Sequence, residues 1–186
     1  MLEPMTNKMI QTVIIMGPPG AGKGVQSELL AKTWSAIHLS SGEMLRQAAD
    51  PRLIAIMNKG LAVPSEDFKT IMRQAVLALP QDRSAVFDGA TIRPAEVPWM
   101  LDLLKECGRR LDRVILLRVD ENVTNERANK RGRHDDAKQT ERWHRYRAET
   151  LQSIELYRRL GLLTEIDGTG TITAVAARIQ DALSSG

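Results

Sequence analysis

The 186-residue chain has one cysteine, Cys107, and no long apolar run. A single thiol forms no internal disulfide and supplies no four-cysteine zinc site, so both are excluded. No run approaches the roughly 20 apolar residues of a membrane-spanning helix. The stretch Met9–Met16 contains Gln11 and Thr12 and runs into Gly-Pro-Pro-Gly, which is typical of a strand and not of a signal peptide. We expect a cytoplasmic protein with no membrane association, no protein-bound zinc and a loose leader at residues 1–8.

The sequence also lacks a strong excess of charge of one sign. Its 26 Lys and Arg residues against 23 Asp and Glu residues give a formal net charge of +3, with a sequence pI near 9.2. That mild basicity suits an anionic ligand without implying nucleic acid. Hydrophobic content of 42% and charged content of 26% are typical of a soluble globular domain. The length fits one domain with small inserts, and we take a monomer as the default.

Short apolar segments alternate with longer helical patterns along the chain. This alternation predicts an α/β fold, a five-stranded parallel sheet with helices on both faces. More than forty residues with two or three helices separate the second and third strands, which indicates an inserted helical flap. We expect strands at Thr12–Met16, Ala36–Leu39, Ala85–Phe87, Arg113–Val119 and Leu162–Ile166. We expect helices at Lys23–Trp34, Ser41–Ala49, Pro64–Leu79, Ala95–Cys107, Asn122–Arg131, Thr140–Leu160 and Thr171–Leu183.

The loop after the first strand carries the most specific signal. Four residues separate Gly17 from Gly22, and Lys23 follows, which is the spacing of a phosphate-binding loop. Glycines let backbone N–H groups and the positive end of the next helix cradle phosphate oxygens, and the lysine reaches the β- and γ-phosphates. An ordinary glycine-rich turn is the alternative. The expected ATP-binding residues here are Gly17, Pro19, Gly20, Ala21, Gly22, Lys23, Gly24 and Val25.

Many such loops place Ser or Thr after the lysine to hold Mg²⁺, but this chain has Gly24 and Val25. Mg²⁺ is therefore expected on other groups and on water, as is common for this hydrated ion. Asp88 ends the apolar run Ala85–Phe87 and precedes Gly89. A carboxylate at the tip of a central strand beside a phosphate loop can hold Mg²⁺ through water. The alternative is a simple turn-forming Asp-Gly pair.

A charged stretch from Arg127 to Arg147 contains eight Lys and Arg residues. Converging arginines suit phosphoryl transfer, in which the group in flight carries negative charge that cations stabilise. A solvated charged face and an RNA-binding patch near Trp143 and Tyr146 are the alternatives. The candidate functional arginines in this stretch are Arg127, Arg131, Arg133 and Arg142.

From about Thr12 to Val175 the chain resembles the adenylate kinase family, the short-lid nucleoside monophosphate kinases. The phosphate loop is similar to the family's first motif. The segment Ser41–Arg46 is similar to its Thr-Gly-Asp-x-x-Arg segment, whose Thr and Arg bind the acceptor monophosphate. Gly60–Pro64 resembles the segment that frames the acceptor base. The resemblance implies that the acceptor is bound by Ser41, Arg46, Val63, Gly89 and Arg93.

The resemblance implies reversible phosphoryl transfer from ATP with Mg²⁺ to a nucleoside monophosphate, with AMP favoured. Arg127 would lie against the donor adenine, and Asp88 would hold the metal through water. The catalytic residues would be Lys23, Arg131, Arg133 and Arg142. The P-loop core would comprise residues 8–39, 70–127 and 139–186, with an acceptor flap at 40–69 and a very short lid at 128–138.

Two departures keep other functions open. The family usually reads Asp-Gly-Phe-Pro-Arg-Thr where this chain reads Asp88-Gly-Ala-Thr-Ile-Arg93, and the adenine-reading Gln a few residues on is missing. The lid is also shortened, with only Gly132 between Arg131 and Arg133. A kinase for CMP, UMP or dAMP, and a nucleotide-binding module without catalysis, are the alternatives. A GTPase is excluded because no Asn-Lys-x-Asp segment is present.

Overall fold

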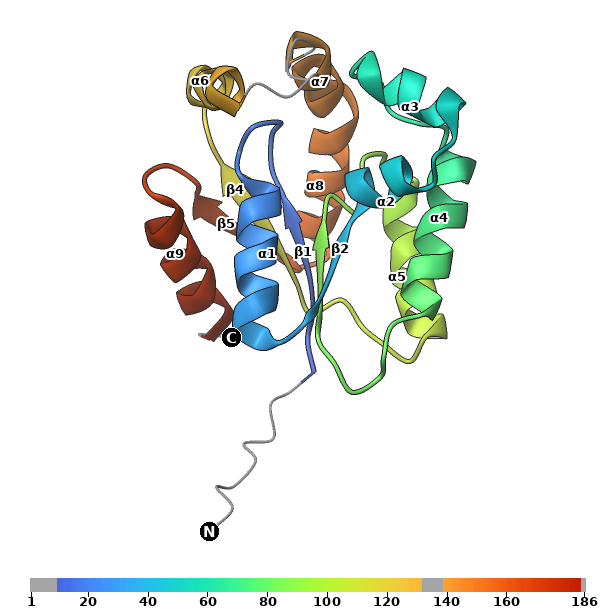
Figure 1. Ribbon diagram of the computed structural model, residues 1–186. Helices are drawn as coiled ribbons and strands as arrows, with labels where there is room; N and C mark the ends of the chain where they lie inside the picture. The colour runs from blue at the N-terminus through green and yellow to red at the C-terminus, as the bar shows by residue number, and fades with distance from the viewer. Residues whose placement is uncertain (1–9, 132–138, 185–186) are drawn as a thin grey trace.

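Five parallel strands form the centre of the molecule in the computed structural model, which describes residues 10–131 and 139–184 (Figure 1). They are hydrogen-bonded in the order β2-β3-β1-β4-β5, and the predicted five-stranded parallel sheet is confirmed. Residue Ile15 of β1 pairs with Asp88 of β3 on one side and with Ile115 of β4 on the other, so the carboxyl ends lie at one edge. The strands are β1 (Thr12–Met16), β2 (Ile37–Ser40), β3 (Ala85–Asp88), β4 (Arg113–Arg118) and β5 (Leu163–Asp167).

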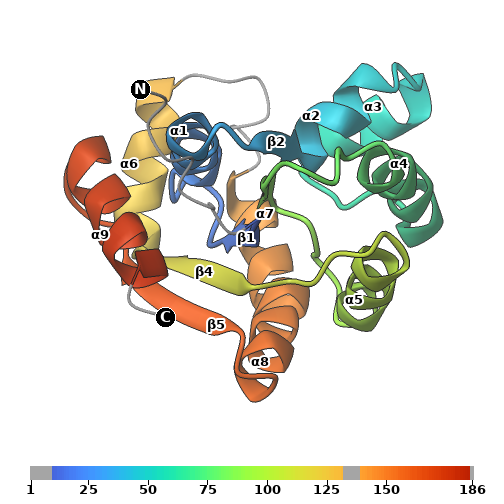
Figure 2. The ribbon, with the colours of Figure 1, turned by 90° about the horizontal axis from the view of Figure 1, so that it is seen from below.

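Helices cover both faces of this sheet because alternate residues of β1 point into two separate apolar clusters. Val13 and Ile15 belong to the cluster under α1 (Lys23–Trp34) and α9 (Ile172–Ser184). Ile14 and Met16 belong to the cluster that includes α5 (Glu96–Glu106) and α8 (Leu151–Arg159). Figure 2 shows the two helix pairs on opposite sides of the sheet. A strand buried on both faces reads as a continuous apolar run, as β1 does.

Three helices lie between β2 and β3, where the sequence predicted ranges for two. They are α2 (Ser41–Gln47), α3 (Pro51–Asn58) and α4 (Ser65–Leu77). The Ser40 hydroxyl accepts a hydrogen bond from the Glu43 N–H at 3.4 Å, which caps α2. Asp50 caps α3 in the same way, with Pro51 in the first helical turn. Figure 1 shows α2 and α3 above the carboxyl ends of the strands.

The segment between β4 and β5 faces the flap across the same edge. Helix α6 (Glu121–Arg131) precedes α7 (Gln139–Arg145), and a π-helical turn at Tyr146–Thr150 joins α7 to α8. The sequence predicted one uninterrupted helix there. A π-turn inserts an extra residue in the helical ladder, and such turns occur frequently at functional sites. Residues 132–138, most of the predicted lid, lie outside the described part. No helix within the described ranges is both long and apolar enough to cross a bilayer.

Candidate functional site

A cavity of about 360 Å³ opens at the carboxyl ends of β1 and β3. Its walls come from segments far apart in the sequence. They are the phosphate loop, α2, the connection between α3 and α4, the loop from β3 to α5, and the helical segment from α7 through the π-turn. Parallel α/β sheets bind ligands at this edge, because the loops that follow adjacent strands meet there.

The phosphate loop has a conformation that requires glycine at its centre. Gly20 has a φ of +88°, and a Cβ there would lie 2.7 Å from the Thr124 carbonyl oxygen. Gly22 precedes α1 without a side-chain cap, so the first N–H groups of that helix remain for a ligand. The Lys23 ammonium donates to the Gly17 and Pro18 carbonyls at 3.0 Å each, which holds it over the loop. The loop thus combines backbone donors with one cation.

Asp88 lies beside the start of α1. Its Oδ2 is 3.4 Å from the Ser40 hydroxyl, which donates to it, and 3.3 Å from where a Cβ on Gly24 would stand. Val25, next along α1, lines the cavity without offering a hydroxyl. Within the described ranges no three His, Cys, Asp or Glu side chains cluster as metal ligands. One carboxylate beside a phosphate cradle fits a hydrated Mg²⁺ that takes its remaining ligands from water and phosphate.

The flap contributes a second polar wall. The Ser41 hydroxyl donates to the Gly89 carbonyl at 2.7 Å and so ties the start of α2 to the loop after β3. Arg46, one turn along α2, lines the cavity with its guanidinium over Gly42. It makes no hydrogen bond or ion pair with any residue that the structure describes. Its charge therefore faces the cavity without an ion-pair partner in the described part of the chain.

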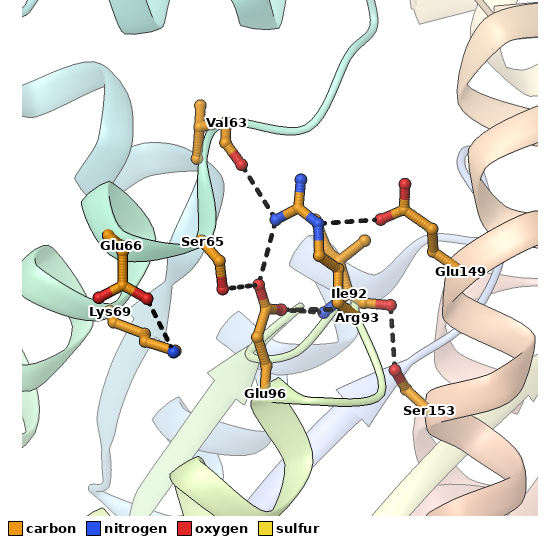
Figure 3. Close-up of polar contacts among 9 residues, drawn as sticks. All are labelled: Val63, Ser65, Glu66, Lys69, Ile92, Arg93, Glu96, Glu149 and Ser153. Atoms are coloured by element: carbon orange, nitrogen blue, oxygen red, sulfur yellow. Dashed lines mark hydrogen bonds and ion pairs between the residues drawn. The ribbon is translucent and has the colours of Figure 1, made fainter.

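Glu96, at the start of α5, organises the loop after β3 (Figure 3). Only 1% of it is exposed. Its Oε2 accepts from the backbone N–H groups of Ile92 and Arg93 at 2.8 and 3.0 Å. Its Oε1 accepts from the Ser65 hydroxyl at 2.9 Å and from Arg93 Nη1 at 3.2 Å. All four acceptor positions are used, so Glu96 positions the loop and its arginine.

Arg93 lies on the cavity wall within this network (Figure 3). Its Nη1 also donates to the Val63 carbonyl at 3.0 Å. Its Nε lies 3.3 Å from Glu149 Oε2, an ion pair without hydrogen-bond geometry. The guanidinium is therefore placed between two carboxylates. The sequence predicted Arg93 and Val63 as site residues but not Glu96, whose signal is its position three residues after Arg93 in the first turn of a helix.

Two side chains of α7 fasten that helix to the phosphate loop and to α6. Gln139 Nε2 donates to the Pro19 carbonyl at 2.8 Å. Trp143, 7% exposed, donates from Nε1 to the Thr124 hydroxyl at 3.1 Å. A neighbouring face of the same helix brings Arg142 and Arg145 to the cavity.

Arg142 was a predicted site residue, whereas Arg145 was not. Arg145 Nη1 donates to the Gly60 carbonyl at the end of the flap. Burial lowers the pKa of the Arg145 guanidinium from its ordinary value, and the charge of nearby Arg142 lowers it further. The signal available in the sequence was the spacing of three residues between the two arginines, which puts them on one helix face.

The remaining predicted arginines lie on α6 or beyond it. Arg127 bridges the phosphate loop and the turn after β5, since it donates to the Ala21 carbonyl at 3.3 Å and to the Gly168 carbonyl at 3.1 Å. Arg131 is the last residue of α6, and its side chain lies outside the described part. Arg133 lies wholly outside it.

Comparison with known proteins gives consistent matches. A family model described as adenylate kinase matches residues 15–162. The adenylate kinase of Prochlorococcus marinus (strain NATL1A) is 34% identical over 183 residues, covering 94% of this chain and 100% of that protein. That of Synechococcus sp. (strain WH7803) is 33% identical, covering 95% and 100%. That of Clavibacter michiganensis subsp. michiganensis is 35% identical, covering 92% of each chain. The matched residues include every segment that lines the cavity.

Proposed function

This chain belongs to the adenylate kinase family of phosphotransferases, and we propose that it transfers a phosphoryl group reversibly from Mg·ATP to AMP. It is a nucleoside monophosphate kinase. Two phosphorylated substrates are favoured because the phosphate loop lines the same cavity as the arginines of the flap and of α7. Such a site aligns two phosphate groups without a covalent intermediate on the protein.

The donor nucleotide binds at the phosphate loop. Lys23 and the backbone amides from Gly17 to Val25 hold its phosphates, and Arg127 lies against its adenine. Asp88 holds the hydrated Mg²⁺ through water. When bound with ATP, Mg²⁺ neutralises charge on the donor phosphates. The proximity of Asp88 to Ser40 and to the start of α1 supports this assignment.

The acceptor binds at the flap side of the cavity. Ser41, Arg46 and Arg93 bind at the acceptor phosphate, while Val63 and Gly89 frame the remainder of the nucleotide. Arg131, Arg133 and Arg142 neutralise the group in transfer. The flap at residues 40–69 and the lid at 128–138 close over the core of residues 8–39, 70–127 and 139–186. Closure expels water, which is the competing acceptor. We further propose a monomer that acts in the cytoplasm, where both nucleotides are metabolites.

A coupled assay of ADP release tests the function. Mg·ATP is supplied with AMP, dAMP, CMP, UMP or GMP, and a reaction without acceptor is the control. Rapid turnover that depends on AMP supports the proposal. A second candidate, a kinase for another monophosphate, is favoured by Arg93 and Glu96 at the acceptor end, where no Gln reads adenine. Turnover with CMP or UMP but not AMP would establish it. Silence with every acceptor would overturn both.

A further inference from the structure

Arg145 lies on the cavity wall one helical turn beyond Arg142. It reaches across from α7 to the rim of the flap, where its Nη1 donates to the Gly60 carbonyl. Arg93 contacts the same rim, where it donates to the Val63 carbonyl at 3.0 Å (Figure 3). Two arginines from separate elements therefore contact one short segment of the flap.

The two arginines differ in their surroundings. Arg93 lies between the carboxylates of Glu96 and Glu149, at 3.2 and 3.3 Å. Arg145 forms no ion pair with any residue in the described ranges, and its one hydrogen-bond partner there is a neutral carbonyl. Burial lowers the pKa of Arg145, as do the like charges of Arg142 and Arg93, while the carboxylate of Glu149 opposes the fall. A partly buried cation that forms no ion pair is costly unless a ligand supplies further opposite charge.

Resting on the proposed function, we propose that Arg145 is a substrate-binding residue that contacts the phosphate of the acceptor monophosphate. Arg46 also lines the cavity and has no ion-pair partner among the described residues. Arg93 is assigned to the same phosphate but is flanked by two carboxylates, so Arg145 adds positive charge to this part of the cavity. A guanidinium fork suits phosphate because two of its N–H groups can bind two oxygens at once.

The competing role is mechanical. In that case Arg145 would only fasten the flap rim to α7 through the Gly60 carbonyl, and its charge would be incidental. Two substitutions separate the roles. Arg145→Gln keeps an N–H donor for the carbonyl but removes the charge. Arg145→Lys keeps the charge but loses the planar fork. Arg159→Gln is the matched control, because Arg159 is an exposed arginine on α8 that pairs with Glu155 at 3.2 Å.

The experiment measures kcat, KM for AMP and KM for ATP, with the shift in unfolding temperature that each nucleotide produces alone. We expect Arg145→Gln to raise KM for AMP by about ten- to a hundredfold, the loss expected of a charge-assisted hydrogen bond. KM for ATP should stay within about twofold, because the phosphate loop is untouched. Arg145→Lys should recover part of the AMP affinity, and Arg159→Gln should match the wild type.

Wild-type KM for AMP in Arg145→Gln would overturn the inference in favour of the mechanical role. An equal rise in both KM values would overturn it in favour of a general disturbance of α7. If the wild type transfers phosphate to no acceptor, the proposed function fails separately. The rise in unfolding temperature produced by AMP then decides alone. Loss of this rise in Arg145→Gln, with the ATP-induced rise retained, supports the phosphate contact. An unchanged AMP-induced rise overturns the inference.

Discussion

Among the described residues, five Lys and Arg side chains line the cavity, and they differ mainly in the carboxylates that surround them. Arg93 is flanked by Glu96 and Glu149, whereas Arg46 and Arg145 form no ion pair with a described residue. Catalysis of phosphoryl transfer depends on positive charge that is already in position when the reaction begins. The sequence does not show which of these arginines has a carboxylate beside it, whereas the contacts in the fold do.

Lys23→Met and Arg142→Ala should each lower kcat by a factor of about ten to a hundred or more, because each removes a cation that stabilises the phosphoryl group in transfer. The coupled ADP-release assay with saturating Mg·ATP and acceptor measures both. Lys32→Met, at the exposed end of the same helix as Lys23, is the matched control. Near-wild-type turnover in either cavity variant would contradict the roles assigned to these two residues.

At the scale of elements, the phosphate loop and α7 depend on each other. A Cβ on Gly20 would lie 2.7 Å from the Thr124 carbonyl of α6 and 3.1 Å from Gln139 Nε2 of α7. Gln139 in turn binds the Pro19 carbonyl at 2.8 Å. The close approach that a glycine permits is thus what allows α6 and α7 to pack on the loop, and α7 carries Arg142 and Arg145.

Gly20→Ala should therefore lower the free energy of unfolding by more than its backbone strain explains. Gly161 supplies the comparison, because it has a φ of +70° and, among the described residues, none but its chain neighbours lies within 4 Å of where a Cβ would stand. Gly161→Ala should cost about 1 kcal/mol of unfolding free energy, from left-handed strain alone. Gly20→Ala should cost more and should abolish the ATP-induced rise in unfolding temperature. Urea unfolding with and without ATP measures both effects, and equal losses in the two variants would show that the contact with α6 and α7 is unimportant.

At the scale of the whole molecule, two tyrosines connect α8 and its π-turn to the core. Burial raises the pKa of the fully buried Tyr157 to about 12, although the hydrogen bond with Thr91 opposes the rise. Burial likewise raises the pKa of Tyr146 to about 12. An unfolded tyrosine titrates near pH 10. Above that pH the unfolded chain loses these protons before the folded chain does, so stability falls as pH rises from about 10 to 12.

For Tyr157 the loss should reach about 3 kcal/mol by pH 12, from a shift of about two pKa units. Tyr157→Phe removes this contribution, at the cost of about 1 kcal/mol at neutral pH for the lost hydrogen bond to Thr91. Urea unfolding should show the wild type more stable than the variant at about pH 9 and less stable at about pH 11.5, because a loss of about 2 kcal/mol exceeds the contribution of the hydrogen bond. Parallel decline of the two proteins between these pH values would contradict a raised pKa at Tyr157.

The order of strands and helices and the phosphate loop followed from the sequence by itself. These features depend on signals within a few residues: apolar runs bounded by turns, the spacing from Gly17 to Lys23, and the Ser40 cap. The helix Lys23–Trp34 and the strand Thr12–Met16 have their predicted bounds for this reason. Membership of the adenylate kinase family also followed, because its motifs are local.

The partners of the cavity arginines were decided only by the tertiary structure. Arg145 meets Gly60 across 85 residues, and Gln139 meets Pro19 across 120. Whether an arginine finds a carboxylate, a carbonyl or an open cavity depends on how whole helices pack, and no local pattern contains that information. The π-turn in the segment predicted as one helix is likewise a feature that only the tertiary structure decided. The sequence thus predicted the chemistry of this site, whereas only the fold showed which of its arginines form ion pairs with carboxylates.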